Sequence, residues 1–162
     1  MQRAVIKVLL LFTLFHEAIF AQNVDIDLII SQAKKTNKNL LILLGQAGCS
    51  YCIRMKKVIL NDKQIQEYFK NDFLFEYIDI KKNGTVTFKD FQGTKRKFAK
   101  HLGHKFYPTS IFINNNYNIV YSQPGVMSKD KFILTLEFIK DQSYKSMNFQ
   151  DYVNKKDFEK EL

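Results

Sequence analysis

The pattern of hydrophobic and polar positions along the chain predicts strands at four places. Residues 40–44 are all Leu or Ile, and such a continuous apolar run is typical of a strand buried on both faces. Residues 73–80 are rich in aromatic and β-branched side chains, which also favour a strand. A third strand is predicted at 109–113, and a turn of three asparagines returns the chain as a fourth at 117–122.

Helical spacing of apolar residues predicts the elements between these strands. A helix capped by Asp62 contains Ile65, and the other helices are expected at 25–36, 49–60, 94–102 and 128–141. Residues 85–91 predict either a small hairpin arm or an irregular loop. Strands separated by helices are expected to be parallel and the final hairpin antiparallel, so the order indicates an α/β protein.

The first 21 residues have the features of a secretory signal peptide. Arg3 and Lys7 precede a short apolar run at 8–15, and the small residue Ala21 stands before the predicted cleavage point. The run is well short of the ~20 residues that span a bilayer. The sequence therefore predicts a signal peptide over 1–21, one domain over 22–142 and a helical tail over 143–162. The expected location is the periplasm, with secretion or the ER lumen as alternatives.

The formal charge of +9 does not by itself indicate nucleic acid. The lysines are scattered, and the densest run, at 95–97, has no aromatic RNA-binding signature beside it. A hydrophobic content of 46% excludes a disordered polyelectrolyte. We therefore interpret the basic residues as a solvated surface and expect no nucleic-acid partner.

The chain has two cysteines, Cys49 and Cys52. An exported domain that used disulfides as staples would spread them along the sequence, and a bridge across so short a loop adds little loop entropy. A dithiol at the start of a helix suits disulfide exchange, because the free N–H groups there favour a thiolate. We therefore predict Cys49 as the nucleophile and Cys52 as the resolving thiol, with this redox-active pair in place of a cofactor.

A metal site is the alternative for the cysteine pair. Tetrahedral zinc takes four ligands, and the histidines after residue 21 are His101 and His104. One is expected within a helix and the other in the following loop, and nothing in the sequence directs either to the cysteines. We therefore predict no metal.

Two short motifs carry a resemblance to a known family. The run Gly48-Cys49-Ser50-Tyr51-Cys52 follows the buried strand, and Tyr107-Pro108-Thr109 precedes the next strand. Over residues 25–140 the chain resembles the thioredoxin superfamily, and within it the exported SoxW-type reductases and the C-terminal domain of DsbD.

The resemblance implies a thioredoxin-like fold, with a central mixed four-stranded sheet, flanking helices and a short C-terminal helical extension. It also implies that Pro108 is a cis-proline beside the cysteines and that Tyr107 faces the substrate. The substrate-binding residues implied in this way are Gly48, Ser50, Tyr51, Tyr107, Pro108 and Thr109.

The chain departs from the family at Leu43, where cytoplasmic thioredoxins hold a buried carboxylate that accepts a proton from the resolving thiol. Proton transfer at Cys52 is then expected to use water, another side chain such as Glu76, or no dedicated base.

The leading functional prediction is a reductase that opens disulfides in partner proteins and receives electrons from a membrane or soluble thiol donor. A disulfide oxidase or isomerase is one alternative, although residues 85–102 leave no room for the large helical insertion of DsbA-like oxidases. A peptide-binding module or chaperone is another, because aromatic residues cluster at Tyr51, Phe106 and Tyr107.

Overall fold

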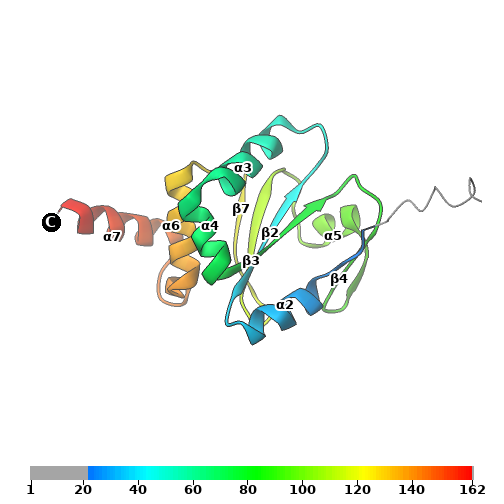
Figure 1. Ribbon diagram of the computed structural model, residues 1–162, viewed down its shortest axis with the longest axis horizontal. Coiled ribbons are helices and arrows are strands. Elements are labelled where there is room, and N and C mark those ends of the chain that lie inside the picture. The colour runs from blue at the N-terminus through cyan, green and yellow to red at the C-terminus, as the bar shows by residue number, and fades with distance from the viewer. Residues whose placement is uncertain (1–21, 162) are drawn as a thin grey trace, which may run out of the picture.

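A computed structural model describes residues 22–161, so the predicted signal peptide lies outside the described residues. The centre of the protein is a four-stranded sheet in the order β3-β2-β6-β7 (Figure 1). Its strands are β2 (Asn39–Gly45), β3 (Phe73–Asp79), β6 (Thr109–Ile113) and β7 (Ile119–Pro124). The expected mixed four-stranded sheet is confirmed, since β2 runs parallel to β3 and antiparallel to β6.

Helices cover both faces of this sheet. On one face, α2 (Ile26–Lys35) and α5 (Lys95–His101) share a core cluster with Leu40, Ile42 and Leu44. On the other, α3 (Ser50–Asn61), α4 (Lys63–Asn71) and α6 (Lys129–Lys140) pack around Leu41 and Leu43. Side chains alternate between the two faces along a strand, so β2 supplies both clusters and needs an apolar residue at every position.

The expectation that strands separated by helices are parallel is wrong for β6. Thr109 pairs with Leu44, so β6 begins at the edge of the sheet where β3 ends. The helix between them, α5, has 7 residues. It therefore spans about 10 Å, against about 23 Å for a seven-residue strand, and is too short to carry the chain back along the sheet.

A second, smaller sheet joins β1 (Val24–Asp25), β4 (Thr85–Phe88) and β5 (Phe91–Thr94). The pair β4–β5 is antiparallel, so residues 85–91, for which the sequence left two alternatives, form part of a hairpin arm rather than an irregular loop. Val86 and Phe88 enter the same cluster as α2, which explains the weak alternation of the sequence there. β1 was not predicted, because two residues carry no periodic signal.

Side-chain caps fix the helix starts close to their predicted positions. Asp25, Asp62, Thr94 and Ser128 each accept a backbone N–H in the first turn of the helix that follows. The start of β7 is two residues later than predicted, because Tyr117 has a φ of 64° and belongs to the turn.

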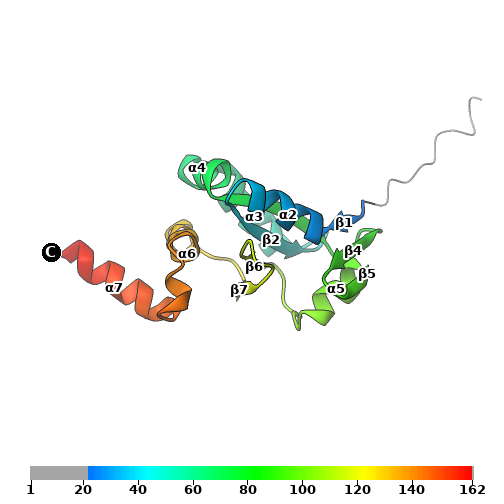
Figure 2. The same ribbon diagram turned by 90° about the horizontal axis from the view of Figure 1, so that it is seen from below.

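The C-terminal segment forms a 3-10 turn (Ser143–Lys145) and the helix α7 (Phe149–Glu161). The ring of Phe138 on α6 lies 5.4 Å from that of Phe149 and 5.3 Å from that of Tyr152. Beyond this contact α7 extends away from the body of the molecule (Figure 2), and Phe158 is 63% exposed. The first half of the helical tail therefore packs on the domain, and the second half extends beyond it.

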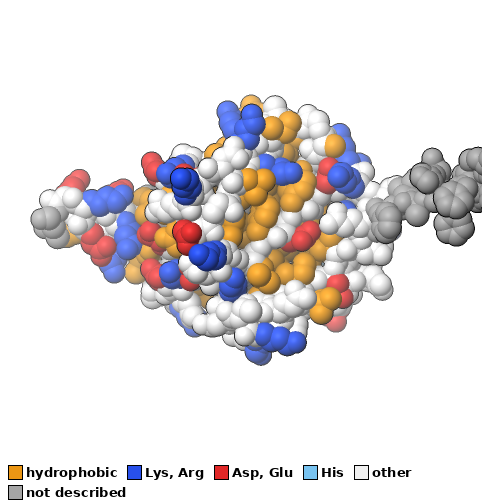
Figure 3. Space-filling view, in the orientation of Figure 1, with side chains coloured by type: hydrophobic (Ala, Val, Ile, Leu, Met, Phe, Trp, Pro, Cys, Tyr) orange, Lys and Arg blue, Asp and Glu red, His pale blue; other side chains and the backbone are white. Residues whose placement is uncertain are grey.

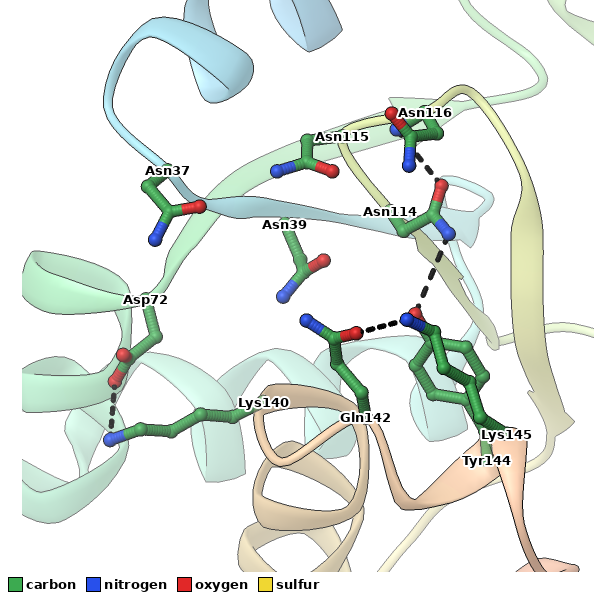
Figure 4. Close-up of a pocket in the computed structure, with 10 residues that line it drawn as sticks. All are labelled: Asn37, Asn39, Asp72, Asn114, Asn115, Asn116, Lys140, Gln142, Tyr144 and Lys145. Atoms are coloured by element: carbon green, nitrogen blue, oxygen red, sulfur yellow. Dashed lines mark hydrogen bonds and ion pairs between the residues drawn. The ribbon is translucent and has the colours of Figure 1, made fainter.

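A polar cleft of about 290 Å³ lies between the tail and the sheet, beside Asn39, the first residue of β2 (Figure 4). Within it, Lys140 lies 3.2 Å from Asp72, and the amide of Asn114 donates to the hydroxyl of Tyr144 over 3.5 Å. These contacts tie α6 and the tail to the sheet. The lining residues are Asn37, Asn39, Asp72, Asn114, Asn115, Asn116, Lys140, Gln142, Tyr144 and Lys145.

Within residues 22–161, none of the helices has the length and apolar character needed to cross a membrane.

Replacing Tyr152 tests whether the first half of α7 belongs to the core. Tyr152 is 3% exposed, so Tyr152→Ala is expected to lower the free energy of unfolding by about 3 kcal/mol through lost contacts and a cavity. The matched control Phe158→Ala, on the exposed half of the same helix, should change it by less than about 0.5 kcal/mol. Urea unfolding followed by circular dichroism measures both, and equal effects would contradict the division of the helix.

Candidate active site

Cys49 stands between the central strand and a helix. After β2 ends at Gly45, Gly48 takes a φ of 79°, a left-handed conformation that favours glycine. Cys49 is then the N-cap of α3, in an extended conformation, and its Sγ accepts the backbone N–H of Cys52 over 3.1 Å. The two cysteines form a disulfide with Cα atoms 5.2 Å apart. In the reduced protein, the same N–H group and the helix dipole favour a thiolate at Cys49.

The two sulfurs differ in their access to solvent. Cys52 is 1% exposed and lies on the side of α3 that faces the sheet, whereas Cys49 is half-buried at the surface. A partner protein therefore reaches Cys49 first. This asymmetry supports the assignment of Cys49 as nucleophile and Cys52 as resolving thiol.

The loop before β6 forms the other wall of the site. The carbonyl oxygen of Tyr107 lies 3.9 Å from Cys49 Sγ, and the Tyr107–Pro108 peptide bond is cis. The carbonyl of Pro108 accepts the N–H of Gly125 over 2.8 Å. Thr109 is buried, and its hydroxyl donates to the carbonyl of Phe106 over 2.6 Å. Thr109 therefore braces the loop, while Tyr107 borders the sulfur.

A shallow groove of about 490 Å³ runs beside the disulfide. The rings of Tyr51 and Phe106 are 59% and 74% exposed at its rim, and Ser50 is exposed at the start of α3. Its single charged lining residue is Arg54, whose guanidinium lies 5.0 Å from the centre of the Tyr51 ring. The groove is lined by Tyr51, Arg54, Phe106, Tyr107, Pro108, Pro124, Gly125 and Val126.

Asp79, which the sequence analysis did not single out, holds the loop that leads to Cys49. It is 6% exposed, and its Oδ1 accepts the N–H of Ala47 over 3.2 Å and that of Lys81 over 3.0 Å. The side chain of Lys81 donates back to the carbonyl of Ala47 over 3.5 Å. A carboxylate at the last position of a mostly apolar strand was the signal available in the sequence.

Tyr77 fills the space beside the start of the same loop. A Cβ atom on Gly45 would lie 2.7 Å from the Tyr77 hydroxyl, so a larger residue at this position would displace the Tyr77 ring. The ammonium of Lys56 on α3 lies 4.2 Å from the centre of the Tyr77 ring. Burial, helped by the charge of Asp79, raises the pKa of Tyr77, so this hydroxyl is neutral at physiological pH.

The suggestion that Glu76 accepts the proton of Cys52 is wrong. Glu76 pairs with Ile42, whose side chain belongs to the cluster under α2 and α5. Cys52 lies on the other face, where Leu43 and Met55 pack together. Burial raises the pKa of Glu76, and the charge of Lys95, the first residue of α5, opposes that shift. The surroundings of Glu76 are therefore those of the face covered by α2 and α5.

Of the two histidines considered as metal ligands, His101 is the last residue of α5 and His104 lies in the loop that follows. His101 is exposed with its ring 4.8 Å from that of Phe91, and burial lowers the pKa of His104. Across residues 22–161, no three side chains of the types His, Cys, Asp or Glu are grouped so that they could hold a metal ion.

Residues 26–140 match the thioredoxin-like domain family. The chain belongs to this family. The resemblance to the thioredoxin superfamily and the α/β thioredoxin-like fold class are therefore confirmed. The finer resemblance to SoxW-type reductases and to DsbD stays a prediction.

Solved structures agree with the thioredoxin-like assignment. A thioredoxin-fold protein from Helicobacter pylori has a TM-score of 0.61 and 28% identity, over 73% of this chain and 79% of that one. A thioredoxin from Thermus thermophilus has a TM-score of 0.56 and DsbH oxidoreductase one of 0.52, each at 14% identity over 74% of this chain and 88% of the other. At 14% identity, these two show the fold alone.

Among curated proteins, the thioredoxin-like chain is 24% identical over 99 residues to signal peptidase I of Streptococcus pneumoniae, strains TIGR4 and R6. The match covers 60% of this chain and 48% of each peptidase, so the chain spans about half the length of the curated relatives it matches. The thioredoxin-like fold and its Cys pair at disulfide distance are consistent with a thiol–disulfide oxidoreductase.

The difference in exposure predicts selective modification of the reduced protein. Cys49 should react with iodoacetamide at least about tenfold faster than Cys52, because it is accessible and its thiolate is favoured by the helix start. Timed quenching and peptide mass spectrometry measure the two rates. Equal rates, or faster labelling of Cys52, would contradict the assigned order of the two thiols.

Proposed function

We propose that this thioredoxin-like protein is an exported reductase of disulfides in partner proteins. The observation that carries the proposal is the pair itself, with Cys49 accessible at the cap of α3 and Cys52 buried directly behind it. A structural disulfide gains nothing from a helix-cap position with one exposed sulfur, whereas dithiol exchange needs both features.

The reaction transfers two electrons from the protein to the partner. The Cys49 thiolate attacks one sulfur of the partner's disulfide, which breaks that bond and forms a mixed disulfide. Cys52, after losing its proton, then attacks Cys49 Sγ and closes the intramolecular bridge. The partner leaves with two thiols, and a membrane or soluble thiol donor returns two electrons to the protein in a separate exchange.

The reductase direction is supported by what stands between β3 and β6. The described chain there holds the hairpin β4–β5 and the seven-residue helix α5, with no large helical insertion of the DsbA type. Periplasmic localisation rests on the signal-peptide features at 1–21. The short apolar run and the small residue before the cleavage point favour a cleaved signal over an anchor.

Removing each sulfur in turn tests the exchange chemistry. Cys52→Ser should accumulate a mixed disulfide between Cys49 and its partners, because nothing resolves it, while Cys49→Ser should form none. Non-reducing electrophoresis and mass spectrometry of the periplasmic fraction detect the adducts. A Cys52→Ser protein that captures no partner would contradict the proposal.

The chaperone alternative has one observation in its favour, the exposed aromatic rim at Tyr51 and Phe106. It predicts that Cys49→Ser keeps full ability to suppress aggregation of an unfolded client. Full retention by Cys49→Ser, together with no disulfide reduction by the parent protein, would favour the binding module over the enzyme.

A further inference from the structure

The segments around the disulfide are positively charged without a compensating free carboxylate. Residues 46–57, 80–84, 102–108 and 123–128 contain lysine, arginine or neutral side chains and no Asp or Glu. The acidic residue at their border, Asp79, is buried and accepts two backbone N–H groups. Figure 3 shows Lys and Arg side chains over the edge of the molecule where α3 begins. This face is therefore complementary to an acidic partner.

Arg54 concentrates that charge inside the groove. Its guanidinium lies 5.0 Å from the centre of the exposed Tyr51 ring, a cation–π contact that limits the freedom of the side chain, and Arg54 itself is exposed. None of the ion pairs found among the described residues includes Arg54. An arginine placed this way matches the two oxygens of a carboxylate.

We propose that Arg54 and Tyr51 form a receptor for a substrate carboxylate, so that the preferred partner segment carries Asp or Glu and an apolar side chain beside its disulfide. The apolar side chain would lie against Phe106, Pro108 and Val126, which line the rest of the groove. This inference rests on the proposed function, and it names the substrate class of the same site.

Cyclic disulfide peptides that differ at one position test the preference. Three peptides carry Glu, Gln or Lys next to an apolar residue and one cysteine, and their reduction by the pre-reduced protein is followed by quenching and mass spectrometry. The rate for each peptide is divided by the rate at which dithiothreitol reduces the same peptide. This ratio removes the effect of the neighbouring charge on the peptide's own thiols. At low ionic strength the Glu peptide should react about fivefold faster than the Gln peptide, and the Lys peptide more slowly.

Variants test whether Arg54 causes the preference for the Glu peptide. Arg54→Gln should bring the Glu-to-Gln ratio to about one, and Arg54→Lys should give an intermediate ratio because it keeps the charge and loses the planar fork. Lys34→Gln makes the same charge change at an exposed position on α2 and should keep the parent Glu-to-Gln ratio. A parent ratio of one, or a ratio that survives Arg54→Gln, overturns the inference. No reduction of any peptide would instead refute the proposed function.

A second observation, independent of the groove, concerns a buried hydroxyl. Ser110 on β6 is 0% exposed, and its Oγ has no hydrogen-bond partner among the described residues. It pairs directly with Leu43 across the antiparallel ladder, so both side chains project toward the face that α3 covers. Buried polar atoms are almost always satisfied, so an orphan hydroxyl needs an explanation.

The position of Ser110 relates it to the resolving thiol. Leu43 lies near the end of β2 from which the chain enters α3, and Cys52 is in the first turn of that helix with its side chain toward the sheet. In the disulfide form Cys52 Sγ is bonded to Cys49, and in the dithiol form it becomes a hydrogen-bonding group. We infer that Ser110 is a positioning residue that hydrogen-bonds Cys52 once the disulfide opens.

The redox equilibrium separates this role from a purely structural one. Ser110→Ala removes a hydroxyl that is unpaired in the disulfide form and paired in the dithiol form. The glutathione equilibrium should therefore shift about three- to tenfold toward the disulfide. Ser110→Thr, which keeps the hydroxyl, should restore the parent value.

The control for hydroxyl removal is Thr135→Val. The Thr135 hydroxyl donates to the Lys131 carbonyl within α6, so its loss should change stability without changing the redox equilibrium. An unshifted equilibrium in Ser110→Ala, or an equal shift in Thr135→Val, overturns the inference. Because the equilibrium is measured on the isolated protein, failure here leaves the exchange function intact.

Discussion

The burial of β2 on both faces is the constraint on which the rest of the structure depends. Leu40 to Leu44 supply one layer of the core with even-numbered side chains and the other with odd-numbered ones, and all five are 0% exposed. A strand of this kind is stable only at the centre of a sheet with helices on both sides. It therefore fixes where the chain emerges at Gly45, and the cysteine pair follows within one short loop.

The chemistry at that edge comes from fixing three segments against one another. Asp79 at the end of β3 accepts the N–H of Ala47 in the loop before Cys49 and the N–H of Lys81 in the turn after its own strand. The cap of α3 directs an N–H at the Cys49 sulfur, and the Tyr107 carbonyl borders it from the start of β6. Because α5 is too short to return the chain along the sheet, β6 begins at this edge, and the Tyr107 loop lies there for the same reason.

Local signals were enough to predict most of this arrangement. The apolar run of β2, the caps at Asp25, Asp62, Thr94 and Ser128, and the Cys49–Cys52 spacing each depend on neighbouring residues, so the sequence carries them directly. What it did not carry depends on contacts between distant segments. The direction of β6, the sheet formed by β1 with β4 and β5, and the face on which Glu76 lies all follow from strand pairing. The contact of Asp79 with Ala47 and the position of Ser110 opposite Leu43 depend on that pairing too.

The central claim is that the Cys49–Cys52 pair is a working redox couple rather than a staple, and its equilibrium reduction potential tests this most directly. Titration against glutathione buffers, read by mass spectrometry of alkylated thiols, gives the value. The account predicts a reversible potential close to about −270 mV, as in thioredoxins. A value near about −120 mV would contradict the reductase direction, and one well below about −300 mV would mark a structural disulfide and contradict the redox function itself.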